Sequence, residues 1–294
     1  MQPFLSPPFF ISLLLIALVT RVTVVAQGAS SASEEPWFFV HITDTQFGMH
    51  TGDRSFDQET ANFEFAVATI NRWRPAFVIV TGDLVNQPGD PAQTAEYLRI
   101  EKKIDPTIPV YRAAGNHDVE NAPTPAALAA YRQQFGADWF SFRRGKFAGV
   151  ILNTSIIHSP GAVAEELARQ RQWLEAELAR LKSEGARPMV VFQHHPWFVM
   201  KAAEPDGYFN LPLARRGDYL ALLTKYGVKQ VFAGHLHRNA IAHDAGIEMI
   251  TNGPLGMPLS PEGSGIRVGI VRGDTVEHTF YPLGRLPNTI KLNE

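Results

Sequence analysis

The stretch Val231-Phe232-Ala233-Gly234-His235-Leu236-His237 decides how this chain folds and where its functional residues gather. An apolar run stops at Gly234, and two histidines follow it, two residues apart. Because alternate side chains of an extended segment point the same way, His235 and His237 can face one pocket. Gly234 has no Cβ, so the backbone can turn close to whatever these histidines hold. One His-x-His pair is weak evidence by itself, since most such pairs are ordinary surface histidines.

Four earlier parts of the chain end in the same way, with an apolar, β-rich run followed by carboxylate, amide or imidazole side chains. The four runs cover residues 38–42, 77–80, 110–114 and 189–192. The polar stretches that follow them are Asp44-Thr45-Gln46, Gly82-Asp83-Leu84-Val85-Asn86, Gly115-Asn116-His117-Asp118 and His194-His195-Pro196. Because α/β folds bind ligands at the carboxyl edge of their sheets, these strand ends predict one polar cluster.

With this order of motifs the chain resembles the calcineurin-like metallophosphoesterases, whose pattern is D-x-H, G-D-x-x-N, G-N-H-D, H-x-P and G-H-x-H. The resemblance covers residues 37–281, and the motifs together are far more specific than any one of them. It implies an α/β fold in the form of a four-layer αββα sandwich, with two mixed sheets flanked by helices. Helical and strand patterns that succeed one another along the chain agree with this architecture.

The resemblance also implies two divalent metal ions at the cluster, drawn from Mn, Fe, Zn and Mg. The ligands of the first ion would be Asp44, Asp83 and His237. The ligands of the second would be Asp83, Asn116, His194 and His235. Asp83 would bridge two ions about 3.5–4 Å apart. His194 is favoured over His195 because the ligand of the H-x-P motif lies two residues before the proline. The alternative is that these residues are helix caps and loop polar groups.

The histidine of the G-N-H-D motif faces the substrate in this family and is not a ligand. His117 would therefore protonate the leaving oxygen or stabilise charge on phosphorus. Asp118 would hold that imidazole charged and oriented, with a plain backbone cap as the alternative. Two further residues are candidates for substrate contacts, namely Arg238, which could equally be a solvated surface arginine, and Tyr208.

Gln46 departs from the family pattern, because the common motif has His at this position. A neutral amide binds a metal weakly through its oxygen, or it only positions a metal-bound water. Gln here is typical of one branch of the superfamily, that of the calcineurin-like phosphoesterase domain-containing proteins, which residues 208–212 and 234–240 also resemble. An oxygen-rich first site shifts the expected metal toward Mn or Mg and away from Zn.

These residues predict a dinuclear-metal-dependent phosphoesterase in which a metal-bound hydroxide attacks the phosphate ester. The branch with Gln favours phosphomonoesters, as small molecules or phosphoproteins, over diesters derived from nucleotides or lipids. The alternative from another class is a non-catalytic metallophosphoesterase-like binding module. Such modules usually lack metal ligands or the substrate-facing histidine, whereas here only Gln46 deviates.

Composition limits the remaining possibilities. The chain has 294 residues, 45% of them hydrophobic, which is enough for a large core in one domain over residues 36–294. Its 27 basic and 29 acidic residues form no polycationic stripe, so nucleic acid is not expected as a partner. The absence of cysteine excludes disulfides, thiolate metal ligands and a cysteine nucleophile.

The first residues have the features of a secretory signal peptide, predicted over residues 1–26. Residues 9–19 form its apolar region, and Val24-Val25-Ala26 offers a cleavage site. Residues 27–35 would be a linker. Cleavage predicts a secreted or periplasmic protein without stable membrane insertion. An uncleaved leader would be a membrane anchor, although its apolar run falls short of the ~20 residues that a span needs.

Two other parts of the chain carry predictions about structure. Residues 198–218 contain two prolines and two glycines and predict a long functional loop. Residues 248–251, 266–271 and 275–280 predict antiparallel strands at the end of the domain.

Overall fold

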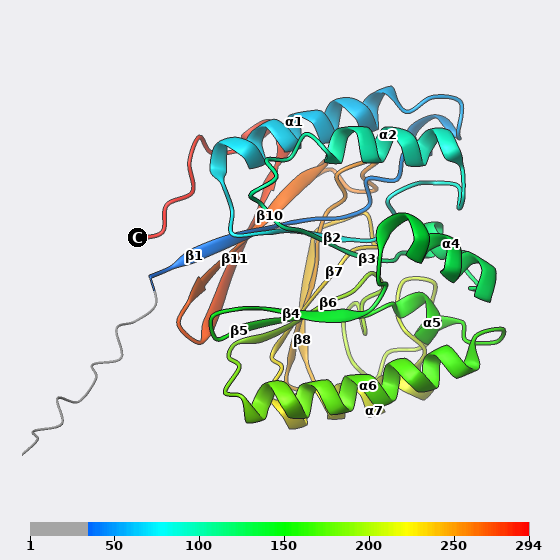
Figure 1. Ribbon diagram of the computed structural model, residues 1–294, viewed down its shortest axis with the longest axis vertical. Coiled ribbons are helices and arrows are strands. Elements are labelled where there is room, and N and C mark those ends of the chain that lie inside the picture. The colour runs from blue at the N-terminus through cyan, green and yellow to red at the C-terminus, as the bar shows by residue number, and fades with distance from the viewer. Residues whose placement is uncertain (1–34, 294) are drawn as a thin grey trace, which may run out of the picture. The chain divides into compact units, whose positions relative to one another are not determined.

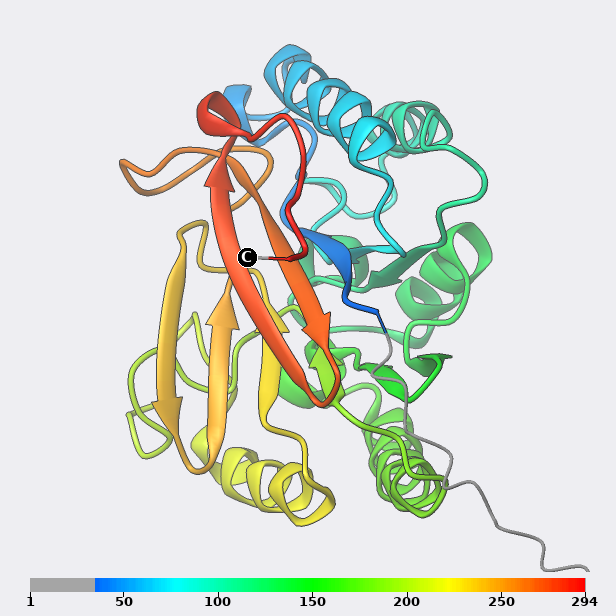
Figure 2. The same cartoon turned by 90° about the vertical axis from the view of Figure 1, so that its left-hand side faces the viewer.

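Two β-sheets packed face to face form the centre of residues 35–293, the part of the chain that the computed structural model describes (Figure 1). The strands of the first sheet are β1 (Trp37–Ile42), β2 (Val78–Thr81), β3 (Val110–Ala113), β10 (Gly265–Arg272) and β11 (Thr275–Pro282). Their order is β11-β10-β1-β2-β3. β1, β2 and β3 are parallel, whereas β10 is antiparallel to both of its neighbours, so the sheet is mixed. Figure 2 shows the β10–β11 hairpin along one edge.

The second sheet is also mixed and has parallel strands at its centre. Its strands are β4 (Phe140–Arg144), β5 (Phe147–Ile151), β6 (Met189–Phe192), β7 (Gln230–Ala233), β8 (Ala240–Asp244) and β9 (Ile247–Thr251). Their order is β4-β5-β6-β7-β9-β8. β5, β6, β7 and β9 run parallel, and the edge strands β4 and β8 are antiparallel to their neighbours.

Helices cover the outer face of each sheet. On the first sheet lie α1 (Asp57–Trp73) and α2 (Pro91–Glu101), with α4 (Pro125–Phe135) beside them. On the second sheet lie α6 (Ala164–Ser183) and α7 (Leu213–Tyr226). Short helices α3 (Asn116–Val119) and α5 (Thr154–His158) follow β3 and β5, and 3-10 turns occupy Met49–Thr51 and Leu283–Arg285. The predicted four-layer αββα sandwich is confirmed. No helix in the described range is both long and apolar enough to cross a membrane.

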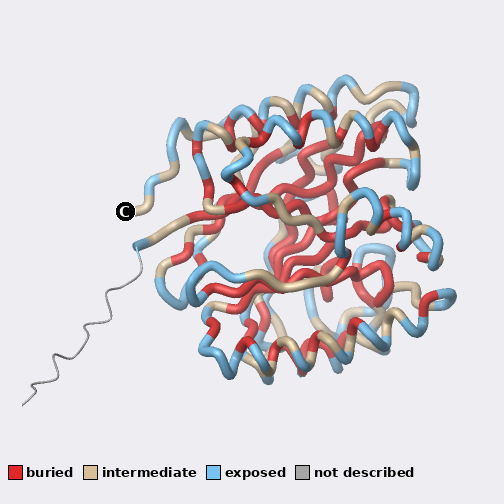
Figure 3. The backbone as a smooth tube through the Cα atoms, viewed as in Figure 1, coloured by how far each residue is buried: buried red, intermediate tan, exposed pale blue. Residues whose placement is uncertain are grey.

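Successive residues of the central strands are buried on opposite sides, which explains the continuous apolar runs in the sequence. In β1, Phe38 and Val40 pack under the helices, whereas Phe39 points between the sheets. The Phe39 ring stacks on Phe77, with centroids 5.0 Å apart, and meets Phe192 edge-on at 5.6 Å. Figure 3 shows buried backbone through both sheets and exposed backbone along the outer sides of the helices.

The structure corrects two predictions about secondary structure. Residues 198–218 are not one loop, because α7 begins at Leu213 within them. Pro212 precedes the first helical residue, where proline is well tolerated, and the apolar face of α7 compensates for Gly217 inside the helix. The other prediction, an antiparallel strand over residues 248–251, holds in part, because these residues belong to β9. This strand is antiparallel to β8, which the sequence analysis missed, but parallel to β7.

The predicted signal peptide and all but the last residue of the predicted linker lie outside the described residues. The described residues, 35–293, cluster as one compact unit.

Candidate metal centre

The parallel strands of both sheets end at the same side of the molecule, and the predicted polar motifs follow these ends (Figure 1). The predicted ligands that follow β1, β2, β3, β6 and β7 are Asp44, Asp83, Asn116, His194, His235 and His237. All of these residues are buried. The fold therefore brings into one cluster residues that are almost 200 positions apart in the sequence.

Asp83 is shared by two groups of ligand atoms, each with its atoms within 4.8 Å of one another. One group consists of Asp44, Asp83 and His237, and the other of Asp83, His194 and His235. The amide oxygen of Asn116 lies 3.1 Å from His194 Nε2 and so belongs with the second group. Two adjacent metal sites with one bridging carboxylate require this arrangement.

A backbone carbonyl fixes the tautomer of each ligand histidine. His194 Nδ1 donates to the Thr81 carbonyl at 2.7 Å, and His237 Nδ1 donates to the Met257 carbonyl at 2.6 Å. His235 donates instead from Nε2, to the Tyr208 carbonyl at 2.9 Å. In each case the other ring nitrogen turns toward the cluster, as in metal sites whose ligands are held by an outer hydrogen bond. The sequence carries no signal for these partners, since every residue has a carbonyl.

The surroundings of His194 Nε2 fit a cation. Asp83 Oδ2 and Asn116 Oδ1 each lie 3.1 Å from this nitrogen, and His235 Nδ1 lies 3.2 Å from it. Asn116 presents its oxygen here because its amide nitrogen donates to Asn121 at 2.9 Å. One proton on His194 can serve only one of these acceptors, whereas a divalent ion can be coordinated by all of them.

The ionisable groups of the cluster shift one another's pKa values. Burial alone lowers the pKa of His194, but the Asp83 carboxylate outweighs burial and raises it to about 9. Burial opposes ionisation of Asp83, yet His194 brings the pKa of this carboxyl well below its ordinary value. His235 behaves differently, because burial and repulsion by His194 lower its pKa to about 4. A metal ion would compete with the His194 proton for the same nitrogen.

Strained backbone is concentrated at the same residues. Positive φ angles occur at Asp44 (49°), Gln46 (38°), Asp83 (50°), His235 (71°) and His237 (49°). This conformation is costly for residues with a Cβ and persists where the surrounding structure enforces it, most often at functional sites.

Two glycines are required by close approach within the cluster. A Cβ at Gly234 would overlap Thr43 Oγ1 and come within 2.5 Å of Asp44 Oδ2. A Cβ at Gly115 would overlap the Asp83 carboxylate. Glycine is therefore needed at both positions for the strand ends to pack together.

Gln46 is buried beside this cluster, and its orientation follows from a chain of hydrogen bonds. Asp53 can only accept, so Asn86 donates to it through Nδ2 at 2.8 Å. Asn86 then accepts from Gln46 Nε2 at 3.1 Å. The remaining atom, Gln46 Oε1, is buried and has no partner among the described residues. A free buried oxygen fits the predicted role of a weak ligand, or of an acceptor for water at the first metal.

The structure places His117 beside the centre and gives Asp118 the hydrogen bonds of its alternative role, a backbone cap. His117 is half-buried, its backbone N–H donates to Asp83 Oδ1 at 2.9 Å, and its Nδ1 donates to the Asn86 carbonyl at 2.7 Å. Within the described part of the chain, no hydrogen bond or ion pair joins Asp118 to this imidazole. It accepts backbone N–H bonds from Leu84 and Gly115, both at 2.8 Å, and so fastens the loops after β2 and β3. Burial and the Asp83 charge raise the pKa of Asp118 to about 7.

The two predicted substrate residues differ in their surroundings. Arg238 is exposed, and its side chain has no hydrogen bond or ion pair among the described residues. The Tyr208 ring lies 4.8 Å from the His235 ring, and 56% of the residue is exposed. Burial and the Asp83 carboxylate raise the pKa of the phenol, while a hydrogen bond with Asn116 opposes them. Tyr208 thus lies at the edge of the second metal site.

The segment between β6 and α7 is held together by Arg216, a buried residue. Its guanidinium donates to the carbonyls of Leu211 (2.7 and 3.1 Å), Ala202 (2.8 Å) and Glu204 (2.8 Å). The hydrogen bonds of Arg216 therefore hold the loop that carries Tyr208 in place.

Replacing this arginine is expected to destabilise the fold. Arg216→Met keeps the aliphatic stem but leaves three carbonyls without a donor, which costs about 3 kcal/mol. For a domain of this size the melting temperature should fall by about 6–12 °C, measured by circular dichroism.

The neighbouring residue supplies the control. The side chain of Arg215 has no hydrogen bond among the described residues, so Arg215→Met should leave the melting temperature within about 1–2 °C of the wild type. An equal fall in both variants would show that the bonds of Arg216 do not stabilise the loop.

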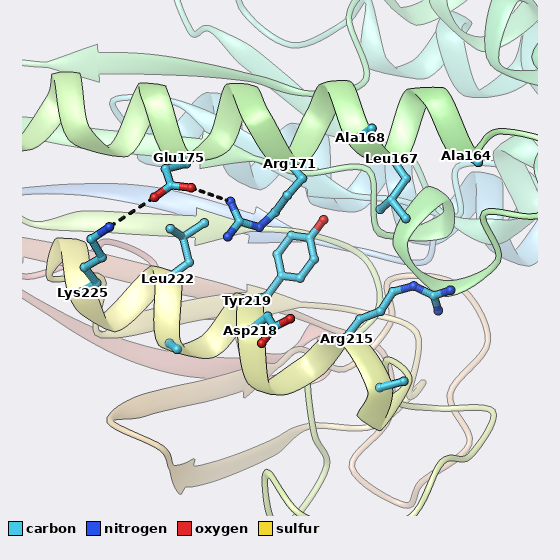
Figure 4. A pocket seen from close by; sticks show the side chains of 12 residues that line it. Ala164, Leu167, Ala168, Arg171, Glu175, Arg215, Asp218, Tyr219, Leu222 and Lys225 are labelled. Atoms are coloured by element: carbon cyan, nitrogen blue, oxygen red, sulfur yellow. Dashed lines mark hydrogen bonds and ion pairs between the residues drawn. The ribbon is translucent and has the colours of Figure 1, made fainter.

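A separate groove of about 570 Å³ lies between α6 and α7, in the helix layer outside the second sheet (Figure 4). Glu175 pairs there with Arg171 and Lys225, both at 3.2 Å. None of the predicted site residues lines this groove.

Comparisons with known proteins relate this chain to phosphoesterases. The family model described as calcineurin-like phosphoesterase matches residues 39–239. The serine/threonine-protein phosphatase CPPED1 of Bos taurus is 34% identical over 266 residues, which cover 85% of each chain. A protein of Rhodopseudomonas palustris named as a probable cyclic nucleotide phosphodiesterase is 30% identical over 212 residues, covering 68% of this chain and 71% of that protein.

Solved structures share the fold. A dimetal phosphatase from Danio rerio superposes with a TM-score of 0.60 at 17% identity, over 85% of this chain and 100% of that one. A purple acid phosphatase from yellow lupin superposes with a TM-score of 0.60 at 16% identity, over 85% of this chain and 52% of that one.

Proposed function

The chain belongs to the calcineurin-like phosphoesterases and is a hydrolase of that family, and from this premise we propose that it is a metal-dependent phosphomonoesterase that acts on phosphoproteins. The metal-dependent chemistry is supported by two ligand groups that share Asp83. His117 lies beside them and belongs to neither group. The serine/threonine-phosphatase names of relatives that match over 85% of both chains support a phosphoprotein substrate.

The ligand side chains form two sets that share Asp83. Asp44, Asp83 and His237 would hold one ion, and Asp83, Asn116, His194 and His235 would hold the other. Divalent ions supply Lewis-acid polarisation of a phosphoryl oxygen and make water more acidic at neutral pH. The expected ions are Mn²⁺ or Mg²⁺, because the side of the cluster with Asp44 and Gln46 is rich in oxygen.

His117 provides the proton for the leaving group. Its Nδ1 is occupied by the Asn86 carbonyl, and its Nε2 has no partner among the described residues. As water adds to phosphorus and the ester bond to phosphorus breaks, a proton held at Nε2 passes to the leaving oxygen. Asp118 contributes indirectly, because its hydrogen bonds hold the loop from which His117 projects.

The reaction class is tested by measuring kcat/KM of the Mn²⁺-loaded protein for three substrates. We expect kcat/KM for p-nitrophenyl phosphate and for a phosphoserine peptide to exceed that for bis(p-nitrophenyl) phosphate by at least about tenfold. Protein treated with a chelator is the control and should be inactive on all three. Faster cleavage of the diester would instead support a phosphodiesterase, the activity that the Rhodopseudomonas relative is named for.

Gln46 provides a second test of the site. If Gln46 Oε1 is a weak ligand, the first metal is held mainly by Asp44, Asp83 and His237 and dissociates first on dilution. Gln46→His should then tighten the first site, because imidazole is a stronger donor than an amide. Metal titration by calorimetry measures this, and Gln58→His, an exposed position on α1, is the control.

Equal metal affinity in the wild type and Gln46→His would rule out ligation by Gln46. In that case Gln46 Oε1 binds water or substrate, and the substitution alters turnover alone.

Export is also part of the proposal, based on the signal peptide predicted over residues 1–26. Cleavage after Ala26 would give a mature chain that begins at Gln27. Mass spectrometry of the protein made in a secreting host tests this, and an intact N-terminus would contradict cleavage.

A further inference from the structure

Exposed apolar residues lie on two loops that are bonded to ligand histidines of the candidate metal centre. Tyr208 is 56% exposed, Phe209 37% and Leu259 54%. A single exposed apolar residue needs no explanation, but apolar groups gathered around a polar site indicate binding. We call these three residues the apolar rim.

The aromatic part of the rim lies against the second metal site. The rings of Tyr208 and Phe209 lie 4.8 and 5.6 Å from the ring of His235. They meet each other edge-on, with centroids 5.2 Å apart. The Tyr208 carbonyl also accepts the His235 N–H at 2.9 Å, so this pair is tied directly to a predicted ligand.

The loop that bears the third rim residue, Leu259, is bonded to a ligand of the first metal site. His237 donates to the Met257 carbonyl at 2.6 Å, and the Leu259 N–H donates to the His237 carbonyl at 2.9 Å. Two hydrogen bonds thus join the loop that bears Leu259 to His237, one to its side chain and one to its backbone. The loops whose carbonyls orient His235 and His237 thus both carry exposed apolar residues.

Hydrogen bonds within residues 199–210 hold the loop that carries the aromatic pair in one conformation. Besides the bonds from Arg216, the Glu204 carboxylate accepts the N–H groups of Val199 (2.7 Å) and Met200 (2.8 Å). Asn210 donates to Glu204 at 2.6 Å and accepts from the Gly207 N–H at 2.9 Å. A surface fixed in advance loses little conformational entropy when it binds a partner.

We propose that the apolar rim binds large hydrophobic side chains next to the phosphorylated residue of a protein substrate. This inference rests on the proposed phosphoprotein phosphatase activity and specifies its substrate class. The phosphate would lie at the buried polar cluster, while the neighbouring side chains cover Tyr208, Phe209 and Leu259 and remove their apolar surface from water.

The test measures kcat/KM of the Mn²⁺-loaded protein for two phosphoserine peptides of equal length and charge. One has Phe and Leu beside the phosphoserine, and the other has Ser and Gly there. We expect wild-type kcat/KM to be about tenfold higher for the apolar peptide, the size of discrimination that a hydrophobic contact provides. Phe209→Ser and, separately, Leu259→Ser should each reduce this ratio to about threefold or less.

Binding and a matched control complete the test. Phosphonate analogues of the two peptides, which cannot be hydrolysed, give the same comparison as dissociation constants by fluorescence anisotropy. Phe65→Ser is the control, because Phe65 is 48% exposed on the outside of α1, and its ratio should equal that of the wild type. Melting temperatures of all variants show that the fold is intact.

Two results would overturn the proposal, and they differ in what they say about function. Equal kcat/KM and equal affinity for both peptides would show that the apolar rim does not select the substrate. This result would not contradict phosphoprotein hydrolysis. Hydrolysis of diesters together with no hydrolysis of either peptide would overturn both.

Discussion

Asp83→Asn is expected to lose at least one of the two metal ions and nearly all turnover. Asp83 is the residue that both ligand groups share, and it is almost completely buried. An amide offers one neutral oxygen where the carboxylate offers two that carry charge, so it cannot bridge two cations. Loss of several kcal/mol of electrostatic stabilisation corresponds to a fall in kcat/KM of about 10³-fold or more.

Metal content and activity are measured on the same sample, by elemental analysis and by hydrolysis of p-nitrophenyl phosphate. Asp218→Asn is the matched control, because Asp218 is an exposed carboxylate in the groove between α6 and α7. It should keep both ions and wild-type activity. Two ions per chain and near-normal activity in Asp83→Asn would show that the assignment of the bridge is wrong.

His117→Ala is expected to keep both metal ions while turnover falls by about 10²–10⁴-fold. His117 belongs to neither ligand group, and only its backbone N–H touches Asp83. If His117 donates a proton to the leaving oxygen, its loss costs more for a poor leaving group. The fall should therefore be larger for a phosphoserine peptide than for p-nitrophenyl phosphate, whose phenolate leaves without help.

The two possible roles of His117 are separated by that comparison. An equal fall for both substrates would mean that His117 stabilises charge on the phosphoryl group and does not protonate the leaving oxygen. Loss of metal in the variant would make His117 a ligand. His243→Ala, at an exposed histidine on β8, is the control and should match the wild type in metal content and in both rates.

Much of the fold could be predicted from the sequence because the central strands are buried on both faces. Such strands must be apolar throughout, so β1, β2, β6 and β7 are visible as short continuous runs. The helix α7 was missed for the opposite reason. Pro212 and Gly217 are residues typical of loops, and only packing against the second sheet compensates for them.

The sequence by itself determined the family, the layered fold and the residue types of the cluster, because metal chemistry needs those side chains at the strand ends. Only the tertiary structure decided what surrounds them. The carbonyls of Thr81, Tyr208 and Met257 that orient the ligand histidines cannot be read from any motif. Asp118 turned out to bind backbone amides and not the His117 imidazole, although the two are adjacent in the chain. The physical reason is common to these cases: a motif fixes which donors and acceptors are present, whereas their partners depend on which loops the packed sheets bring within hydrogen-bonding distance.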